Sequence, residues 1–437
     1  MHKIFRSFIT DDIISMMMKR IRASDLVLRW RPKVKSIKLT RRKVIQVLAV
    51  IVRATGRQVK PNESQPNLRI QRNTLMKVSE ELGKDIVGGD IIMRLVAHLL
   101  ITEEIMVKVV ENFTDYVFAL GECVAGDEKL FKYTAQSPLV RQVPTKPDKV
   151  GLWFYQMCAN LKNGMAFCLY IKLHNNVSGS VTVDLVVSDW QGIIMKVGAD
   201  RVAPGNNPNP RTVLVFDNYY PTRAICKRLM EDKVPFTCSC RYDRFKGHVE
   251  KLRGPNHAKD NVKGESMAMH RRATGEVFVY VSDVQLNEVK YNLSYGFTEE
   301  TNQREIKKRG GEIPIYSYYK LMFNTCDHFN RSLHDRSWPY HRGGKGVKGD
   351  LGRINDFCMA VTLENTFNAW YDINNISDKQ ISFRNLCDIL SESLYLESLA
   401  IEDKVDEDDS DDNDSTNDNI ANNGNTVVEE SDDDDES

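Results

Sequence analysis

The spacing of apolar residues predicts that the first part of the chain is helical. Between residues 41 and 112 apolar side chains recur every three or four positions, which is the spacing of an amphipathic helix; examples are Val44, Val47, Leu48 and Ile51. Gly88 and Gly89 interrupt this spacing before a further helical run at residues 91–100. We therefore expect a helical lead-in that ends near Gly121.

After Gly121 the pattern changes to shorter runs that are typical of β-strands. Residues 123–133, 150–161 and 165–173 are rich in apolar and β-branched side chains. Asn163-Gly164 lies between the second and third runs, and this dipeptide is a strong signal for a tight β-hairpin. Apolar residues alternate along the next stretch, which predicts a further strand at residues 181–187.

The stretch Thr212 to Tyr220, with the sequence TVLVFDNYY, combines a buried strand with an acid at its end. Val213 to Phe216 are apolar, and Asp217 follows them directly. An acid at the carboxyl end of such a strand lies where open α/β sheets bind their ligands. Asp is also a favoured residue for capping a following helix, so the stretch alone leaves both roles open.

The pattern around Asp217 predicts the fold class. Residues 224–230 have helical spacing, and residues 234–240 form the next apolar run. A succession of strand, hairpin, strand, helix and strand is typical of a mixed α/β domain with one central sheet. We therefore predict an α/β fold behind a helical N-terminal lead-in.

Residues 241–312 interrupt this pattern, and we interpret them as an insertion domain. Nine lysines and arginines gather in the first part of this segment, while residues 277–281 and 290–295 are typical of strands. Helical spacing returns at residues 316–334, which contain Asp327, and again at residues 354–373. A glycine-rich loop is expected between these two helical stretches, from His341 onward.

The net charge of zero conceals two oppositely charged parts of the chain. The segment from Glu402 to the C-terminus holds 17 acidic residues and one lysine, so residues 1–401 carry an excess of 16 basic residues. A basic body favours a polyanionic partner, nucleic acid first. The acidic tail is typical of a disordered segment, and it suggests contacts with histones or with an acid-directed kinase.

The N-terminal composition and the cysteines bear on the compartment. Residues 1–60 hold 16 lysines and arginines against three acids, and two of their basic runs are typical of nuclear import signals, phosphate contacts or a solvated helix face. The nine cysteines show no secreted disulfide pattern, and no apolar run reaches the length of a membrane span. We expect a nuclear protein with no membrane partner.

Three acids on separate predicted elements form a candidate metal site. Asp127 lies in the first strand, Asp217 at the end of a later strand and Asp327 in a later helix. Two-metal phosphoryl transfer requires carboxylates from separate elements to converge on two ions, and Mg²⁺ prefers such oxygen ligands. The spacing alone does not single out this triple among 60 acidic residues, and Asp283 is a rival third carboxylate.

Two further motifs are weaker. Cys238, Cys240, His248 and His257 offer zinc-ligand chemistry, but the single residue between the cysteines suits a tetrahedral site poorly. The run Gly343-Gly-Lys-Gly lacks the Lys-Ser/Thr ending of a nucleotide-binding loop. We expect neither a zinc site nor an ATP site there.

The sequences that flank the three acids are informative as a series. The chain contains Gly126-Asp-Glu, Pro144-Thr-Lys-Pro-Asp-Lys-Val-Gly151, Phe216-Asp-Asn-Tyr-Tyr-Pro-Thr, Cys240-Arg-Tyr-Asp-Arg244, Tyr318-Tyr-Lys with Cys326-Asp327, and Phe367-Asn-Ala-Trp-Tyr371. In this order they resemble the piggyBac transposase family, a DDE/DDD group of cut-and-paste DNA transposases and their domesticated relatives. The resemblance extends over roughly residues 42–375.

The resemblance implies an RNase H-like catalytic core, with an inserted β-rich domain before the helix that bears the last aspartate. It implies that Asp127, Asp217 and Asp327 hold two Mg²⁺ (or Mn²⁺) ions for DNA strand cleavage and transfer. Trp338 is a candidate base-stacking side chain. Further residues would contact DNA phosphates, which contribute affinity rather than sequence choice: Lys146, Lys149, Arg241 and Arg244.

The chain departs from the family pattern at Asn330, where the family has a second aspartate, and it shows no cysteine-rich module for binding transposon ends. We predict a piggyBac-like transposase, or a domesticated derivative, with double-stranded DNA as partner and homodimerisation as a further candidate property. The alternative is a catalytically silent DNA-binding or chromatin protein derived from a transposase.

These patterns predict six segments. They are a basic N-terminal segment at 1–41, a helical dimerisation or DNA-binding region at 42–120, the first part of the core at 121–240, the insertion domain at 241–312, the second part of the core with C-terminal helices at 313–400, and the acidic tail at 401–437.

Overall fold

The computed structural model describes part of this chain, and Met1–Ile401 is one compact unit. The described residues are 1–23, 39–57, 68–83, 102–117, 123–175 (except 135, 145, 147 and 148), 182–199, 212–245 (except 242 and 243), 267–271, 277–283, 288–296, 314–334, 347–376 and 381–401. Several predictions lie outside them: the helical run at 91–100, His248, His257, Trp338, residues 341–346 of the glycine-rich loop and the acidic tail from residue 402. The last three residues predicted for that loop, 347–349, instead begin a helix.

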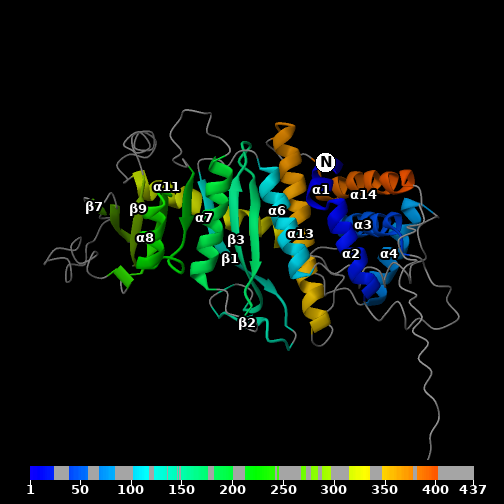
Figure 1. The fold of residues 1–437 in the computed structure, drawn as a ribbon, viewed down its shortest axis with the longest axis horizontal. Coiled ribbons are helices and arrows are strands. Elements are labelled where there is room, and N and C mark those ends of the chain that lie inside the picture. Colours follow the sequence, from blue (N-terminus) through cyan, green and yellow to red (C-terminus); the bar gives the residue numbers. More distant parts are fainter. Residues whose placement is uncertain are drawn as a thin grey trace, which may run out of the picture. The chain divides into compact units, whose positions relative to one another are not determined.

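The predicted helical lead-in is present wherever its residues are described. We call the following helices the helical region (Figure 1): α1 (His2–Phe8), α2 (Asp11–Ala23), α3 (Arg41–Gly56), α4 (Leu68–Leu82), α6 (Glu103–Tyr116) and α14 (Phe383–Ala400). The side chain of Thr40 caps α3 by accepting a hydrogen bond from the backbone N–H of Lys43 at 3.3 Å. α3 is buried over most of its length because α4 and α14 pack along it.

A mixed sheet forms the second part of the molecule, as the pattern predicts. In the described residues it has nine strands in the order β2-β3-β1-β5-β6-β9-β8-β7, with β4 also paired to β3. The strands are β1 (Cys123–Lys132), β2 (Val140–Gln142), β3 (Val150–Asn160), β4 (Ala166–Leu173), β5 (Val213–Phe216), β6 (Phe236–Cys240), β7 (Met267–Arg271), β8 (Val277–Asp283) and β9 (Glu288–Tyr295).

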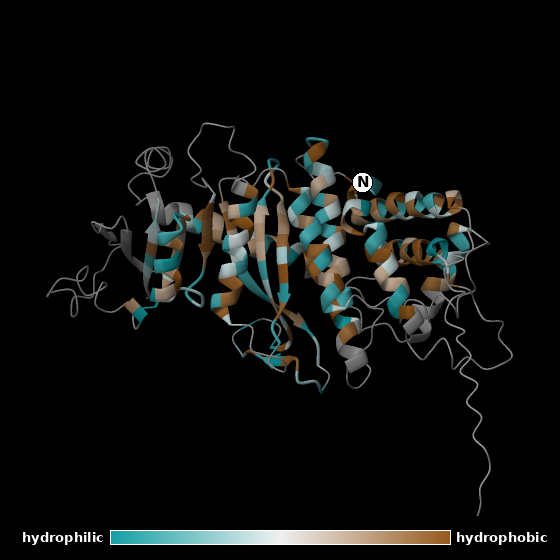
Figure 2. Cartoon of the chain, in the orientation of Figure 1, coloured by the Kyte–Doolittle hydropathy of each residue, from teal (hydrophilic) through white to brown (hydrophobic). Residues whose placement is uncertain are grey.

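The directions of the strands divide this sheet. β1 runs parallel to β5, and β5 runs parallel to β6, whereas the other pairs are antiparallel. The two predicted strands at 277–281 and 290–295 are confirmed as β8 and β9, and they extend the same sheet through the β6–β9 pair. The central strands are mostly brown in Figure 2, in keeping with their burial.

The predicted hairpin at Asn163-Gly164 joins β3 to β4. Gly164 has a φ of +82°, a backbone conformation that favours glycine. The side-chain oxygen of Asn163 accepts a hydrogen bond from the backbone N–H of Met165 at 3.0 Å. This local turn chemistry holds the two strands in their antiparallel pairing.

The strand predicted at residues 181–187 is wrong, because the chain forms helix α7 (Val183–Ala199) there. Val187, Trp190, Ile194 and Val197 are all buried and recur every three or four residues, which is helical spacing. The alternation seen over the first few residues was too short a window to separate the two periods. Leu185, which the alternation placed with the core, is 51% exposed.

The remaining helices pack on the sheet or beside it. They are α8 (Arg223–Glu231), α11 (Pro314–Phe323), α12 (Thr325–His334) and α13 (Val347–Ile373). α6 and α13 contact both β4 and α1, so they lie between the sheet and the rest of the helical region (Figure 1). No helix in the described part of the chain is long and apolar enough to cross a membrane.

The two faces of the central strands are covered by different helices. On one face, Phe357 of α13 stacks on Phe154 of β3, with ring centroids 4.1 Å apart. On the other, Trp190 of α7 lies directly over Gly126, where an added Cβ would come within 2.2 Å of the indole ring. Since side chains alternate along a strand, Asp127 shares the α13 face and Glu128 shares the α7 face.

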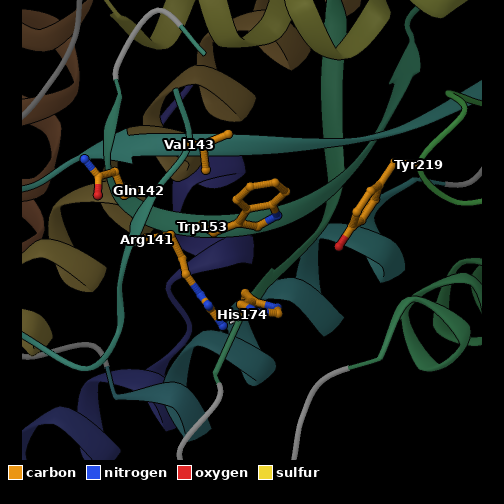
Figure 3. Close-up of a pocket in the computed structure, with 6 residues that line it drawn as sticks. All are labelled: Arg141, Gln142, Val143, Trp153, His174 and Tyr219. Carbon is orange, nitrogen blue, oxygen red and sulfur yellow. Dashed lines mark hydrogen bonds between the residues drawn. The ribbon is translucent and has the colours of Figure 1, made fainter. Parts of the chain in front are cut away.

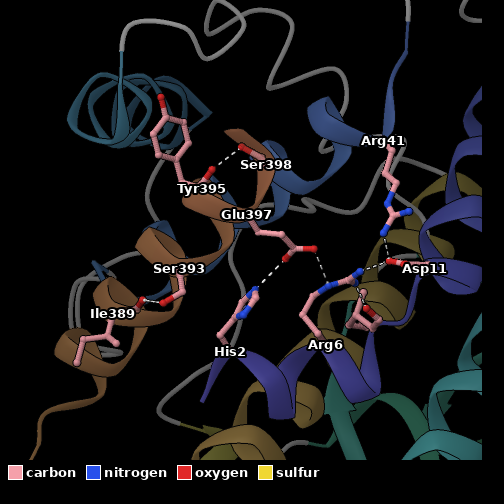
Figure 4. A network of polar contacts seen from close by, with 10 residues as sticks. His2, Arg6, Asp11, Arg41, Ile389, Ser393, Tyr395, Glu397 and Ser398 are labelled. Atoms are coloured by element: carbon pink, nitrogen blue, oxygen red, sulfur yellow. Dashed lines mark hydrogen bonds and ion pairs between the residues drawn. The ribbon is translucent and has the colours of Figure 1, made fainter. Parts of the chain in front are cut away.

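Ion pairs join the first helix to the last. His2 Nε2 lies 2.8 Å from Glu397 Oε2, and Arg6 Nε donates to Glu397 Oε1 at 3.1 Å. Arg6 also pairs with Asp11, which in turn pairs with Arg41 (Figure 4). We call these five residues the N-terminal ion-pair network, and within it each carboxylate faces a basic side chain.

Candidate active site beside strands β1 and β5

Two of the three predicted aspartates are brought together by the pairing of β1 with β5. The register of this parallel pair aligns Gly126 with Phe216. Asp127 and Asp217 therefore come next on neighbouring strands, at equivalent positions. The sequence placed each acid on a strand, but only the sheet pairing makes them neighbours.

Asp217 does not cap the helix that follows it. Thr222 caps α8 instead, with its side chain accepting a hydrogen bond from the N–H of Ile225 at 3.2 Å. Asp217 Oδ1 accepts from the backbone N–H of Tyr219 at 2.7 Å, so the carboxylate is held in the turn directly after β5. The capping alternative left open by the sequence is thus wrong, and Asp217 is directed to the site.

Arg244 holds the same turn from outside. One of its guanidinium nitrogens donates to the carbonyl oxygens of Tyr219 at 2.9 Å and Pro221 at 3.0 Å, and it lies 3.3 Å from that of Asn218. In this structure the predicted phosphate contact therefore supports the loop that carries Asp217. Two other predicted phosphate contacts, Lys149 and Arg241, are exposed at the surface.

Glu128 is a site residue that the sequence interpretation did not single out. Its Oε1 lies 3.0 Å from Nζ of Lys146, and its Oε2 accepts from the hydroxyl of Tyr220 at 2.9 Å. Tyr220 is completely buried. The sequence offered two signals: the Asp-Glu pair at 127 and 128, and the second tyrosine after Asp217. Neither signal predicts that Tyr220 contacts Glu128.

The site holds more negative than positive charge, and its pKa values show the consequence. Burial and then the charge of Glu128 raise the pKa of Asp127 well above its usual range, although Lys146 opposes the shift. The same two causes raise the pKa of Asp217 to about 6. Burial by itself lowers the pKa of Lys146, but the negative charges of Glu128 and Asp127 outweigh it, so the pKa is raised overall.

A buried amide faces Asp127 across the strand pair. Gln156 of β3 is directly opposite Asp127 in the antiparallel register, so both side chains lie on the α13 face of the sheet. Gln156 is completely buried, and neither atom of its amide has a hydrogen-bond partner among the described residues. The side-chain oxygen of Asn330 on α12 is also buried without a partner. Such groups are rare in folded proteins and need an explanation.

The third predicted aspartate differs from the first two in its exposure. Asp327 is exposed in the first turn of α12. Its neighbour Cys326 is buried and donates to the backbone oxygen of Ala125 at 3.1 Å, so this turn packs against β1 close to Asp127. Among the residues that the structure describes, no three Asp, Glu, His or Cys side chains gather closely enough to hold a metal ion.

The chemistry of the two-aspartate site nevertheless fits a hard divalent cation. Asp127 and Asp217 supply carboxylate oxygens, and Lys146, held by Glu128, is the basic group beside them. The orphaned amide of Gln156 adds a neutral oxygen on the face of Asp127. Mg²⁺ prefers oxygen ligands of this kind, and a bound cation would offset the charge excess.

The other candidate ligands are placed elsewhere. Cys238 and Cys240 are buried in β6, where the thiol of Cys238 points to the backbone oxygen of Leu293 at 3.6 Å. Of Asp283 the structure describes only the backbone, at the end of β8. Each of the nine cysteines is a buried free thiol.

Comparison with known proteins gives a fold but no family. No protein-family model and no curated protein matches this sequence. Among solved structures, the cryo-EM structure of a piggyBac transposase synaptic complex with hairpin DNA matches with a TM-score of 0.65. The match covers 92% of this chain and 82% of that chain, at 14% sequence identity. This protein therefore has a fold like that of piggyBac transposase.

Proposed function

We propose that this protein is a piggyBac-like transposase, or a derivative of one, that cleaves and transfers DNA strands by metal-dependent phosphoryl transfer. The observation that carries the proposal is the β1–β5 register, which brings Asp127 and Asp217 together at equivalent positions of neighbouring parallel strands. The order β4-β3-β1-β5-β6 supports an RNase H-like core. The similarity in fold to a transposase supports it independently.

The residues that would hold two Mg²⁺ ions are Asp127, Asp217 and Asp327. When bound, such ions stabilise the charge on the attacking and leaving oxygens of phosphoryl transfer. Asp217 is oriented by the N–H of Tyr219, and Asp127 Oδ1 by the N–H of Glu128 at 2.7 Å. For Asp327 to join them, the first turn of α12 must bring its carboxylate in from the surface.

The positive groups of the site have a defined part in this proposal. Lys146, held by Glu128 at 3.0 Å, lies beside the carboxylates and would contact the phosphate next to the cleaved bond. Lys149 and Arg241 are exposed and would contact the DNA backbone. A basic body suits double-stranded DNA, and we propose a nuclear location for that reason.

The test is cleavage of a hairpin-ended or branched DNA by the purified full chain. We expect Mg²⁺- or Mn²⁺-dependent nicking that Asp217→Asn and Asp127→Ala both abolish, with DNA binding retained in each. Asp115→Asn is a matched control, because Asp115 is an exposed aspartate on α6 paired with Lys196. Undiminished nicking by Asp217→Asn would show that the site is elsewhere.

A catalytically silent DNA-binding protein is the second candidate. The exposure of Asp327 and the presence of Asn330 in place of an acid favour it. In that case neither the wild type nor the variants would cut DNA, and all would bind DNA with the same dependence on salt.

A further inference from the structure

A half-open pocket lies on the α7 face of the sheet, beside the carboxylates. Its volume is about 200 Å³, and it is lined by Arg141, Gln142, Val143, Trp153, His174 and Tyr219 (Figure 3). The rings of Trp153 and Tyr219 form its aromatic walls, with their centroids 6.0 Å apart and their planes at 44°. His174 lies below Trp153, with ring centroids 6.3 Å apart.

The polar groups of this pocket include two kinds of hydrogen-bond donor. The indole Nε1 of Trp153 is buried and has no acceptor among the described residues. Arg141 donates one N–H to Nε2 of His174 at 2.8 Å, which assigns the imidazole proton to Nδ1, 2.9 Å from the hydroxyl of Tyr155. This contact orients a guanidinium whose planar shape presents several N–H groups.

Two turns connect the pocket to the carboxylates. Tyr219 lines the pocket with its ring, while its backbone N–H holds Asp217 at 2.7 Å. Val143 lines the pocket at the start of the turn that carries Lys146, whose backbone N–H donates to the oxygen of Val143 at 3.2 Å. A DNA strand bound at Asp217 and Lys146 would therefore lie next to this pocket.

We propose that the pocket receives one unpaired nucleobase of the DNA strand bound at the carboxylates, an inference that rests on the proposed function. Aromatic side chains stack on the face of any base. Arginine and indole N–H groups can donate to acceptor atoms on the Watson–Crick edge, which is open only when the base is unpaired. The pocket has room for a single heterocyclic ring system between its aromatic walls.

The test compares two DNAs that differ in one base. Each is a duplex with a short single-stranded flank, and one carries an abasic site in that flank. Fluorescence anisotropy with EDTA present measures binding without cleavage. We expect the wild type to bind the intact flank about tenfold more tightly than the abasic one. Trp153→Ala should reduce this ratio to near one by weakening only the binding of the intact flank.

A second pair of variants separates stacking from a loss of fold. Trp153→Phe keeps an aromatic wall but removes the N–H, so it should give an intermediate ratio. Trp370→Phe is the matched control, because Trp370 lies on α13 against Tyr371, away from the pocket lining, and should leave the ratio unchanged. Equal binding of both DNAs by the wild type would overturn the proposal. An equal loss of affinity for both DNAs in Trp153→Ala would also overturn it.

These outcomes are independent of catalysis. A protein that cleaves with Mg²⁺ but does not distinguish the abasic flank would retain the proposed function and lose the pocket assignment. A protein that binds the intact flank more tightly and never cleaves would retain the pocket and lose the proposed chemistry.

Discussion

The N-terminal ion-pair network and the carboxylate site each gather several charged side chains, but only the network balances them. In the network, Glu397 faces His2 and Arg6, and Asp11 faces Arg6 and Arg41. In the site, Asp127, Glu128 and Asp217 lie around Lys146, and burial together with the charge of Glu128 raises the pKa of both aspartates.

This difference separates charges that are neutralised within the chain from charges that the chain leaves in excess, as the proposed cation site requires. A buried carboxylate is costly unless a positive group compensates it. The network meets that requirement within the chain. The site does not, and it adds the orphaned amide of Gln156 on the same face as Asp127. We therefore expect a bound divalent cation to raise the stability of the folded protein.

The largest expected effect is a gain of stability in Asp217→Asn, which tests whether the charges of the site are unbalanced. Because the folded state raises the pKa of Asp217 to about 6, it binds that proton more tightly than the unfolded chain does. The wild type therefore loses stability as pH rises from about 4 to about 6. At neutral pH without divalent ions, we expect the variant to be more stable by up to about 3 kcal/mol.

Chemical unfolding over a pH series measures this gain. Below pH 4 the two proteins should converge, because both then carry a neutral group at position 217. Mg²⁺ or Mn²⁺ should stabilise the wild type more than the variant. A variant less stable than the wild type at neutral pH would mean that the site is charge-balanced like the network.

The next effect concerns Gln156. Replacing it by Met keeps most of the volume and removes two buried polar atoms without partners. We expect the free energy of unfolding without metal to rise by about 1–2 kcal/mol. We also expect Mn²⁺ to raise the melting temperature less than it does in the wild type. A fall in stability would show that the amide has a structural partner, and the metal role of Gln156 would be lost with it.

The smallest effect comes from the network and has the opposite sign. Glu397→Gln removes the carboxylate partner of His2 and leaves Arg6 paired with Asp11, and Glu397 has only 22% of its side chain exposed. We expect thermal unfolding to show a loss of about 1 kcal/mol. Glu231→Gln is the control, since Glu231 and its partner Lys227 are both exposed and contribute little. Equal losses in the two variants would remove the distinction between buried and surface pairs.

Local signals predicted the elements of this fold well where they depend on neighbours in sequence. The turn at Asn163-Gly164, the helix that begins after Thr40 and the strand before Asp217 each follow from a few adjacent residues. The error at 181–187 arose from the same reliance, because a few residues of a largely apolar helix also match a strand pattern. Only the longer spacing through Trp190 separates the two.

The sequence by itself determined which side chains were available: an acid in one strand, an acid after another, and a lysine and tyrosines near them. Tertiary structure alone decided how they meet. The β1–β5 register aligns Gly126 with Phe216 and so brings the next residues, Asp127 and Asp217, side by side. The hydrogen bond from Tyr220 to Glu128 joins residues that are 92 positions apart in the chain. Tertiary structure also left Asp327 exposed and Gln156 without a partner. The reason is that pairing between distant segments depends on the packing of the whole sheet and its helices, which no local spacing records.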